Sequence, residues 1–233
     1  MIIEARNLSK KVIFNDQEIV ILDDINLKVS AGSSLAVIGP SGSGKSTLLG
    51  ILAGLDSPSS GEIFINQKPL HELSEDVRAR IRKDSVAFVF QNFELLAGLN
   101  ALENVMLPIE LKGKKNAKDI AETYLEKVGM QNRLTHYPQQ LSGGEQQRVA
   151  IARAFACEAD VLFCDEPTGN LDSSNSELIA NLIFDAFMES SSALMRTRGE
   201  CDGAWARMRH ATHRPSSLHC RARNNSSNGI MKP

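Results

Sequence analysis

A glycine-rich stretch of nine residues constrains this chain more than any other part of it. It consists of Gly39, Pro40, Ser41, Gly42, Ser43, Gly44, Lys45, Ser46 and Thr47, with apolar runs at 35–38 and 48–52 on either side. A strand, a tight turn and a helix N-terminus in this order form a cradle for phosphate, because unpaired N–H groups and the positive end of the helix dipole converge there. The sequence therefore predicts a phosphate-binding loop.

The pattern G-x4-G-K-[ST] is filled at every position of this loop. We expect Lys45 to reach the β- and γ-phosphates of a nucleotide and the Ser46 hydroxyl to hold Mg2+. The alternative is an exposed Gly/Ser turn followed by an ordinary lysine. The flanking strand and helix patterns favour the phosphate loop over that alternative.

Composition sets wide limits on the rest of the chain. The 233 residues, 42% of them apolar, suffice for one large domain or for a domain with a smaller insert. A net charge of -2 gives no general case for nucleic acid or an anionic membrane as partner. Four cysteines without C-x-x-C spacing suit a reducing cytoplasm. No apolar run approaches the roughly 18 residues of a membrane span, so we expect a soluble chain that needs a partner for any membrane role.

The first 30 residues read as short strands with antiparallel pairing. Residues 12–14 and 19–22 are expected to pair across the polar turn 15–18. Further along, residues 62–66 alternate as a strand, residues 71–83 indicate an exposed amphipathic helix, and residues 85–90 form an apolar strand that ends at Gln91.

Residues 92–141 differ in character and predict a helical insert between two strands. Residues 101–105 look helical, and a second helix is marked by an apolar stripe of Ala117, Ile120, Ala121, Tyr124, Leu125 and Val128. The basic stretch 112–118 between them is interpreted as a solvated connection, and we assign it no site.

A second candidate phosphate site begins at Ser142. Ser142 and Glu145 have the spacing of a capping box that opens a helix. Ser142, Gly143 and Gly144 at that N-terminus also suit an anion. On its own the segment reads as a cap. Because one nucleotide rarely needs two such sites in one chain, its presence beside the first loop suggests that it closes on the nucleotide of another subunit.

Two adjacent acids follow a buried strand at residues 161–164. Asp165 and Glu166 would stand at the carboxyl end of that strand, where open α/β sheets bind ligands. Asp165 can hold Mg2+ through water, and Glu166 is then free to orient and deprotonate an attacking water. The alternative is a pair of solvated acids at a strand end.

Taken together, these segments resemble the ATP-binding cassette ATPases. The matching stretches are GPSGSGKS at 39–46, Gln91, LSGGEQ at 141–146, VLFCDE at 161–166 and GNLD at 169–172. NALENV at 100–105 adds a similarity to the group that contains lipoprotein-releasing and macrolide-exporting ATPases. The resemblance covers about residues 1–190. It implies an α/β fold of the P-loop NTPase type, with a mostly parallel sheet, an N-terminal antiparallel β subdomain and an inserted helical subdomain.

The resemblance also implies a mechanism. Two copies would form a head-to-tail homodimer around two ATP molecules, each held between Lys45 of one subunit and Ser142, Gly143 and Gly144 of the other. Gln91 would contact Mg2+ and the water, while Asn170 and Asp172 would lie across the dimer interface. The helical insert would dock on an integral-membrane permease. The chain would then be a cytoplasmic, Mg-dependent ATPase on the inner face of the membrane that powers an exporter or extractor of lipoprotein, lipid or a hydrophobic compound.

Two features depart from the family pattern. An aromatic residue that stacks on adenine is usual after the first strand, but Val12 stands at the aligned position, with Phe14 nearby. The family also has an apolar strand and a switch histidine thirty-odd residues after the paired acids. Residues 190–199 contain no histidine.

The end of the chain has a different composition. Residues 188–233 hold eight Lys and Arg against three Asp and Glu, without an apolar period. We expect residues 191–233 to form an aberrant, disordered tail, and a slip of the reading frame near residue 195 would explain it. A basic arm for nucleic acid is disfavoured, because aromatic residues do not alternate with the basic ones.

Three function classes remain. The leading hypothesis is an ATPase subunit of a membrane transporter. The alternative is a truncated or frame-shifted relative that binds nucleotide or permease but hydrolyses poorly. DNA-repair ATPases with similar motifs are disfavoured, since the insert is short and has no Cys/His cluster.

Overall fold

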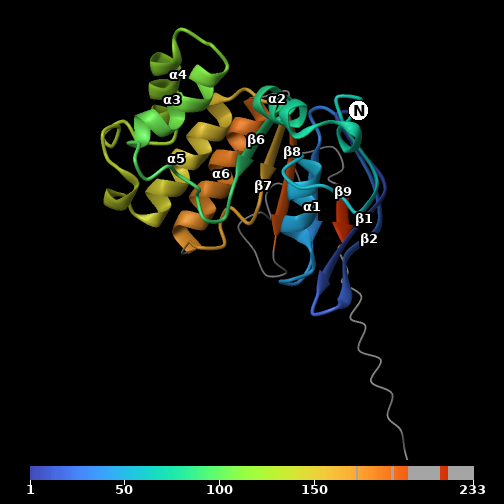
Figure 1. The fold of residues 1–233 in the computed structure, drawn as a ribbon. Coiled ribbons are helices and arrows are strands. Elements are labelled where there is room, and N and C mark those ends of the chain that lie inside the picture. The colour runs from blue at the N-terminus through green and yellow to red at the C-terminus, as the bar shows by residue number, and fades with distance from the viewer. Residues whose placement is uncertain (172, 190–191, 199–215, 220–233) are drawn as a thin grey trace, which may run out of the picture.

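The computed structural model describes residues 1–171, 173–189, 192–198 and 216–219 (Figure 1). Two sheets organise this part of the chain: a four-stranded sheet in the order β2-β1-β4-β5 and a five-stranded sheet in the order β6-β7-β8-β3-β9. The first is antiparallel and the second parallel, as the fold class inferred from the sequence requires. None of the described helices is long and apolar enough to cross a membrane.

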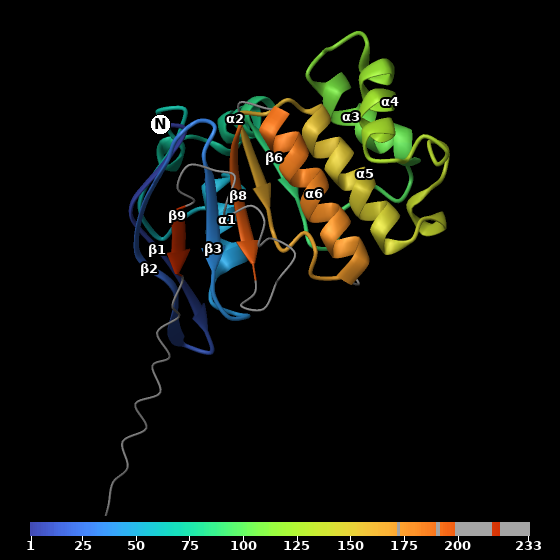
Figure 2. The same ribbon diagram turned by 180° about the vertical axis from the view of Figure 1, so that it is seen from behind.

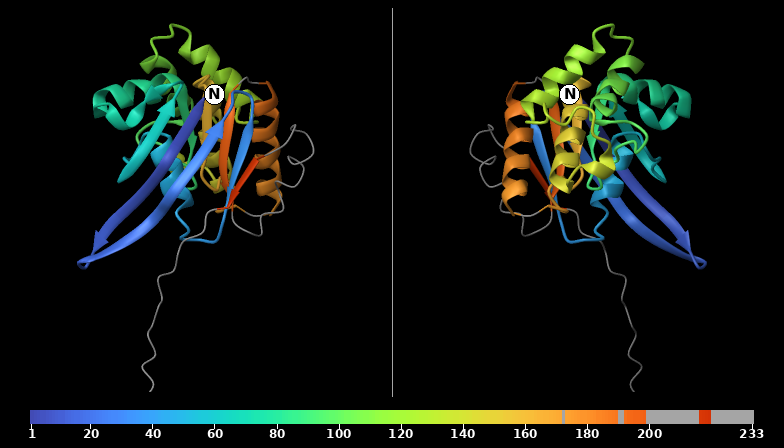
Figure 3. Two further views of the ribbon diagram at one scale, coloured as in Figure 1. Left: turned by 90° about the vertical axis from the view of Figure 1, so that its right-hand side faces the viewer. Right: turned by 90° about the vertical axis from the view of Figure 1, so that its left-hand side faces the viewer.

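The antiparallel sheet is built on one long hairpin. Its strands are β1 (Ile3–Phe14), β2 (Gln17–Val29), β4 (Ser60–Ile65) and β5 (Lys68–Pro69). Val12 pairs with Ile19, which confirms the predicted pairing, but the turn is only two residues long. Asn15 and Asp16 both have positive φ, the conformation that matches the right-handed twist of the flanking strands. The hairpin projects away from the body of the molecule (Figure 3).

The parallel sheet separates two apolar cores. Its strands are β3 (Ser34–Ile38), β6 (Val86–Val89), β7 (Val161–Cys164), β8 (Ala193–Arg198) and β9 (Ser216–His219). Along β7, Val161 and Phe163 join the core on the side of the antiparallel sheet, whereas Leu162 and Cys164 join the core on the other side. Successive side chains of a strand point to opposite faces, so an unbroken apolar run is what a strand covered on both faces needs.

Helices cover both faces of this sheet. They are α1 (Lys45–Leu52), α2 (Glu75–Ser85), α3 (Ala101–Leu111), α4 (Ala117–Lys127), α5 (Gly143–Ala156) and α6 (Ser173–Glu189), with short 3-10 turns η1 (Leu70–Glu72) and η2 (Pro138–Gln140). Helices α5 and α6 lie on one face, with α1 on the opposite face (Figure 2). Within the predicted insert, α3 and α4 pack against α5, and the apolar stripe of α4 is buried at Ala117, Ala121 and Leu125.

The basic connection between α3 and α4 is more than a solvated loop. The Lys112 ammonium donates to the backbone oxygens of Asp84 (3.1 Å) and Cys157 (2.5 Å), and Lys114 forms an ion pair with Glu158. Cys157 is the C-cap of α5, where a positive charge complements the helix dipole. The expectation of free solvation is therefore wrong for these two lysines, which fasten the insert to the end of α5.

Strand β8 corrects the predicted boundary at residue 190. It lies between β7 and β3, in the middle of the parallel sheet, and Leu194 and Met195 are fully buried. Strands β7 and β3 pair with its backbone on either side. The ATPase domain thus continues at least to residue 198. Apart from β8 and β9, the expected disordered tail lies outside the described residues.

An arginine occupies the middle of this central strand. Arg196 is only 5% exposed and stands in register between Cys164 of β7 and Ala36 of β3. Burying a guanidinium costs free energy, and the groups around it must compensate for the water that it loses.

Candidate functional site

The glycine-rich loop leaves β3 and enters α1 in a conformation that only glycine adopts without cost. Gly42 and Gly44 have φ of 77° and 86°. A Cβ on Gly44 would also lie 3.0 Å from the Ile21 backbone oxygen and 3.1 Å from the Leu22 side chain. Strand β2 therefore backs the loop, and the hairpin helps to set its shape.

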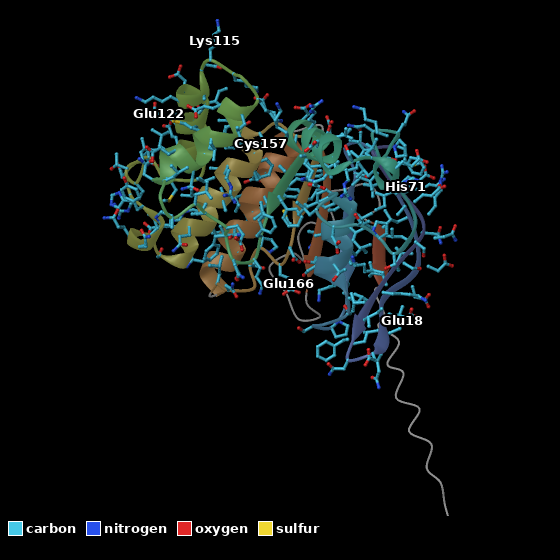
Figure 4. The ribbon with its side chains drawn as sticks, viewed as in Figure 1. Glu18, His71, Lys115, Glu122, Cys157 and Glu166 are labelled. Atoms are coloured by element: carbon cyan, nitrogen blue, oxygen red, sulfur yellow. The ribbon has the colours of Figure 1, made fainter. Side chains whose placement is uncertain are left out.

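Lys45 lies at the centre of the loop. Its ammonium donates to the backbone oxygens of Gly39 and Pro40, at 3.0 Å each, and forms an ion pair with Glu166 at 3.1 Å. The Lys45 side chain is 4% exposed and that of Glu166 is 29% exposed. Glu166 lies beside the N-terminal end of α1 (Figure 4). The structure thus joins two residues that the sequence predicted for one site and that stand 121 positions apart (166 minus 45).

The loop fits a phosphate chain. Among the described residues, the Ser43 hydroxyl is buried without a hydrogen-bond partner. Helix α1 has no acidic residue in its first turn, and its N-cap, Gly44, provides no side-chain oxygen. The N–H groups at the start of α1 and the Ser43 hydroxyl are thus left for an anion, as the sequence predicted for this loop.

The acids that follow β7 are held by a threonine of β8. The Thr197 hydroxyl donates to Asp165 Oδ1 (2.7 Å) and accepts from the Glu166 backbone N–H (2.9 Å). Glu166 has φ of 41°, an uncommon value for a residue other than glycine. One hydroxyl thereby fixes both acids. Sequence reasoning missed Thr197, because its position at the carboxyl end of a central strand became visible only with β8.

Gln91 contacts the loop that follows the acids. Its Nε2 lies 3.5 Å from Asn170 Oδ1, and Asn170 Nδ2 donates to the Gln91 backbone oxygen (3.1 Å) and to Asn92 Oδ1 (3.2 Å). A Cβ on Gly169 would approach the Gln91 amide to 3.1 Å. Ser46, Gln91 and Asp165 remain the predicted ligands of Mg2+.

The serine-glycine segment caps α5 as predicted. The Ser142 hydroxyl accepts from the Glu145 N–H, and the Glu145 carboxylate accepts from the Ser142 N–H (2.9 Å). That backbone bond, helped by the Ser142 hydroxyl and Arg133, lowers the pKa of the Glu145 carboxyl against the opposing effect of burial. A Cβ on Gly144 would lie 2.9 Å from Asn175 Oδ1. No hydrogen bond or ion pair in the described chain links Ser142, Gly143 or Gly144 to the phosphate loop. Their role toward a second subunit remains a prediction.

Two predicted contacts to the nucleotide or the second subunit, that of Asp172 and the one to adenine, remain predictions. Asp172 lies outside the described residues. Val12 is half-buried, and Phe14, at the tip of the hairpin, is 64% exposed, so either side chain is accessible to a nucleotide base.

Comparison with known proteins identifies the family. A family model described as "ABC transporter" matches residues 22–169, which is more than half of the chain. The chain belongs to this family. An ABC transporter ATP-binding protein of Escherichia coli K12, YbbA, is 50% identical over 196 residues, covering 83% of this chain and 86% of YbbA. The lipoprotein-releasing system ATP-binding protein LolD of Saccharophagus degradans is 45% identical over 78% of this chain and 81% of its own.

Solved ABC cassettes have the same fold. The dimeric cassette MJ0796 in a post-hydrolysis state, bound to ADP and Pi, superposes with a TM-score of 0.84 at 33% identity over 94% of each chain. A second dimeric structure of MJ0796 gives a TM-score of 0.83 at 36% identity over 93% of this chain and 94% of that one. The P-loop fold, the ABC family and the dimeric state of the solved cassettes agree with what the sequence implied.

We expect Thr197→Val to destabilise the protein by about 1–3 kcal/mol, because it leaves the Glu166 N–H and the Asp165 carboxylate without their shared partner. Thr197→Ser keeps the hydroxyl and should lose less than half as much. Urea unfolding measures both variants. Equal stability of the valine and serine variants would mean that the hydroxyl contributes nothing.

Glu145 gives a prediction in pH. A carboxyl whose pKa is lowered on folding adds stability that is complete above its unfolded pKa, roughly 4.3, and is lost as the pH falls through the folded value. Glu145→Gln should therefore be less stable than the parent at pH 7, with the difference shrinking below pH ~4. Chemical unfolding across this range tests it. Glu110→Gln, at an exposed position of α3, serves as control.

Proposed function

We propose that this chain is the ATP-hydrolysing subunit of a membrane transporter and acts as a homodimer. The observation that carries the proposal is the contact between Lys45 and Glu166 at 3.1 Å, made where the loop fits a phosphate chain. A phosphate-binding lysine and a carboxylate able to activate water then act on one bond. The family supports ATP with Mg2+ as the nucleotide, and MJ0796 was solved with ADP and Pi.

Each residue has a distinct part in this chemistry. ATP supplies the γ-phosphoryl group that is transferred to water. Lys45 would hold its β- and γ-phosphates, and Ser46, Asp165 and Gln91 would hold Mg2+. Glu166 would orient and deprotonate the water. The Lys45 ammonium forms an ion pair with Glu166. A phosphate chain that competes for Lys45 would release the carboxylate to act as a base.

A second subunit would complete the site. The Ser142, Gly143 and Gly144 tip of α5 has no described bond to the loop of its own chain, and MJ0796 was solved as a dimer. We propose that the tip of one subunit contacts the nucleotide on the other, with Asn170 and Asp172 at the interface.

A groove beside α3 suits the permease. It encloses about 300 Å3 between β6, α3 and α5, and its lining includes the exposed side chains of Leu96 and Leu111. We propose that it binds a short amphipathic helix of an integral-membrane permease, which would hold the subunit at the inner face of the membrane. The names of YbbA and LolD support this partner. The LolD likeness favours a lipoprotein or another lipid-like molecule as cargo.

A second candidate function is nucleotide binding with poor hydrolysis. Arg198 ends β8 in register with Ile38, thirty-odd residues after Asp165, at the place where the resemblance expects a switch histidine. A guanidinium does not exchange protons near neutral pH as an imidazole does. A reading-frame slip near residue 195 would account for both Arg196 and Arg198.

We expect the parent chain to hydrolyse ATP with Mg2+ and Glu166→Gln to lower kcat at least ~100-fold, because the general base is lost. Phosphate release measures the rate. Glu126→Gln, at an exposed position of α4, should retain the parent rate. Equal rates for the parent and Glu166→Gln would favour the second candidate.

A further inference from the structure

Arg153 of α5 makes two hydrogen bonds that neither the phosphate loop nor the acids explain. Its guanidinium donates from Nη2 to the Phe93 backbone oxygen (2.9 Å) and from Nη1 to the Glu94 backbone oxygen (2.6 Å). The planar fork of an arginine suits two neighbouring acceptors, which the single ammonium of a lysine does not match. Helix α5 begins at the Ser142 cap, so this contact ties the body of that helix to the segment after Gln91.

The backbone that Arg153 grips is held in an unfavourable conformation. Phe93 and Glu94 have φ of 64° and 49°, and neither is glycine. Left-handed geometry is costly for residues with a Cβ, and two in succession persist only where the surroundings impose them. The N–H groups of the pair donate to the backbone oxygens of Phe90 (3.2 Å) and Asn92 (2.7 Å). Both carbonyl oxygens meet the Arg153 guanidinium, which is therefore the side-chain restraint on this backbone.

Residues 91–94, which include the pair bound by Arg153, contact the other parts of the site. Asn170 binds the backbone of Gln91 and the side chain of Asn92, as described above. The Phe93 ring also lies close to Gly143: a Cβ added to that glycine would be 3.7 Å from the ring. The segment 91–94 therefore meets the loop after the acids on one side and the glycine tip of α5 on the other.

The chain beyond this segment is fastened separately. The Asn104 side chain of α3 is 1% exposed, accepts from the Leu96 N–H (2.8 Å), and donates to the backbone oxygens of Leu96, Leu99 and Asn100. Asn104 thus fixes residues 96–100 to the insert. Between Gln91 and Leu96, Arg153 is the side chain that hydrogen-bonds to the backbone oxygens of Phe93 and Glu94 in the part of the chain that the structure describes.

We propose that Arg153 is a positioning residue: it holds Phe93 and Glu94 in their left-handed conformation and thereby sets the place of Gln91 beside the loop that follows the acids. The catalytic consequence rests on the proposed function, whereas the conformational one does not. The competing explanation is that the long side chain of Arg153 only fills space between α5 and its neighbours. These two explanations differ in what removal of the hydrogen-bond donors does to the segment.

Hydrogen exchange on the nucleotide-free chain tests the conformational part. Arg153→Met keeps the side-chain length and removes the donors, and Arg153→Lys keeps the charge without the fork. We expect the Phe93 and Glu94 amides to exchange about tenfold faster in Arg153→Met, with Arg153→Lys between the methionine variant and the parent. Arg148→Met is the matched control on the same helix, since the Arg148 side chain makes no hydrogen bond or ion pair within the described residues. Parent-like exchange in Arg153→Met would overturn the proposal.

A rescue experiment tests the catalytic part. We expect Arg153→Met to lower kcat for ATP about tenfold, with KM within about twofold of the parent. Adding Glu94→Gly should recover several-fold of that loss, because glycine adopts positive φ without strain. Adding Glu94→Ala removes the same side chain without relieving the strain and should recover nothing. Equal recovery by both, or by neither, would favour a space-filling role and overturn the positioning role.

The two experiments also separate this inference from the proposed function. A parent chain that binds but does not hydrolyse ATP would overturn the proposed function alone, because the exchange rates of Phe93 and Glu94 still decide what Arg153 holds. Normal hydrolysis in Arg153→Met together with parent-like exchange would overturn the inference and leave the proposed function intact.

Discussion

The contact between Lys45 and Glu166 is the constraint on which the rest of the site depends. An ammonium this well buried needs compensation, which it finds in the Glu166 carboxylate and in the oxygens of Gly39 and Pro40. The contact joins the carboxyl ends of β3 and β7, which are not neighbours in the sheet. Strand β8 lies between them and supplies Thr197 to hold the acids. The position of the acids beside Lys45 therefore depends in part on β8.

Sequence alone predicted what local patterns encode. The phosphate loop, the Ser142–Glu145 capping box and the buried strand before Asp165 each follow from a few adjacent residues. Strand β8 was missed, because Arg196 interrupts a short apolar run and only the neighbouring strands identify it as central. Lys112 was assigned to solvent for a related reason: its acceptors, the backbone oxygens of Asp84 and Cys157, are distant in sequence. Roles that depend on long-range partners were the part that sequence could not supply.

The segment after Gln91 contacts α5, the loop after the acids and the helical insert. Arg153 reaches it from α5, Asn170 from the loop after the acids, and Asn104 holds the chain that follows it. Arg153, Glu94 and Asn104 also line the groove beside α3. A molecule bound in that groove touches the same guanidinium that sets the backbone next to Gln91. The strained backbone of Phe93 and Glu94 therefore links the groove to Gln91. Arg153 of α5 holds this backbone, and Asn104 of α3 holds the residues after it.

The division of the apolar interior by the parallel sheet has an evolutionary consequence. Side chains on one face of β7 pack with α1 and the hairpin, whereas those on the other face pack with α3, α5 and α6. Substitutions that share no neighbours act on stability independently. One layer can accumulate changes that suit a new membrane partner while the layer behind it keeps the geometry that phosphate requires. A single sheet thus lets the layer with α3, α5 and α6 change without altering the layer that packs against the phosphate loop.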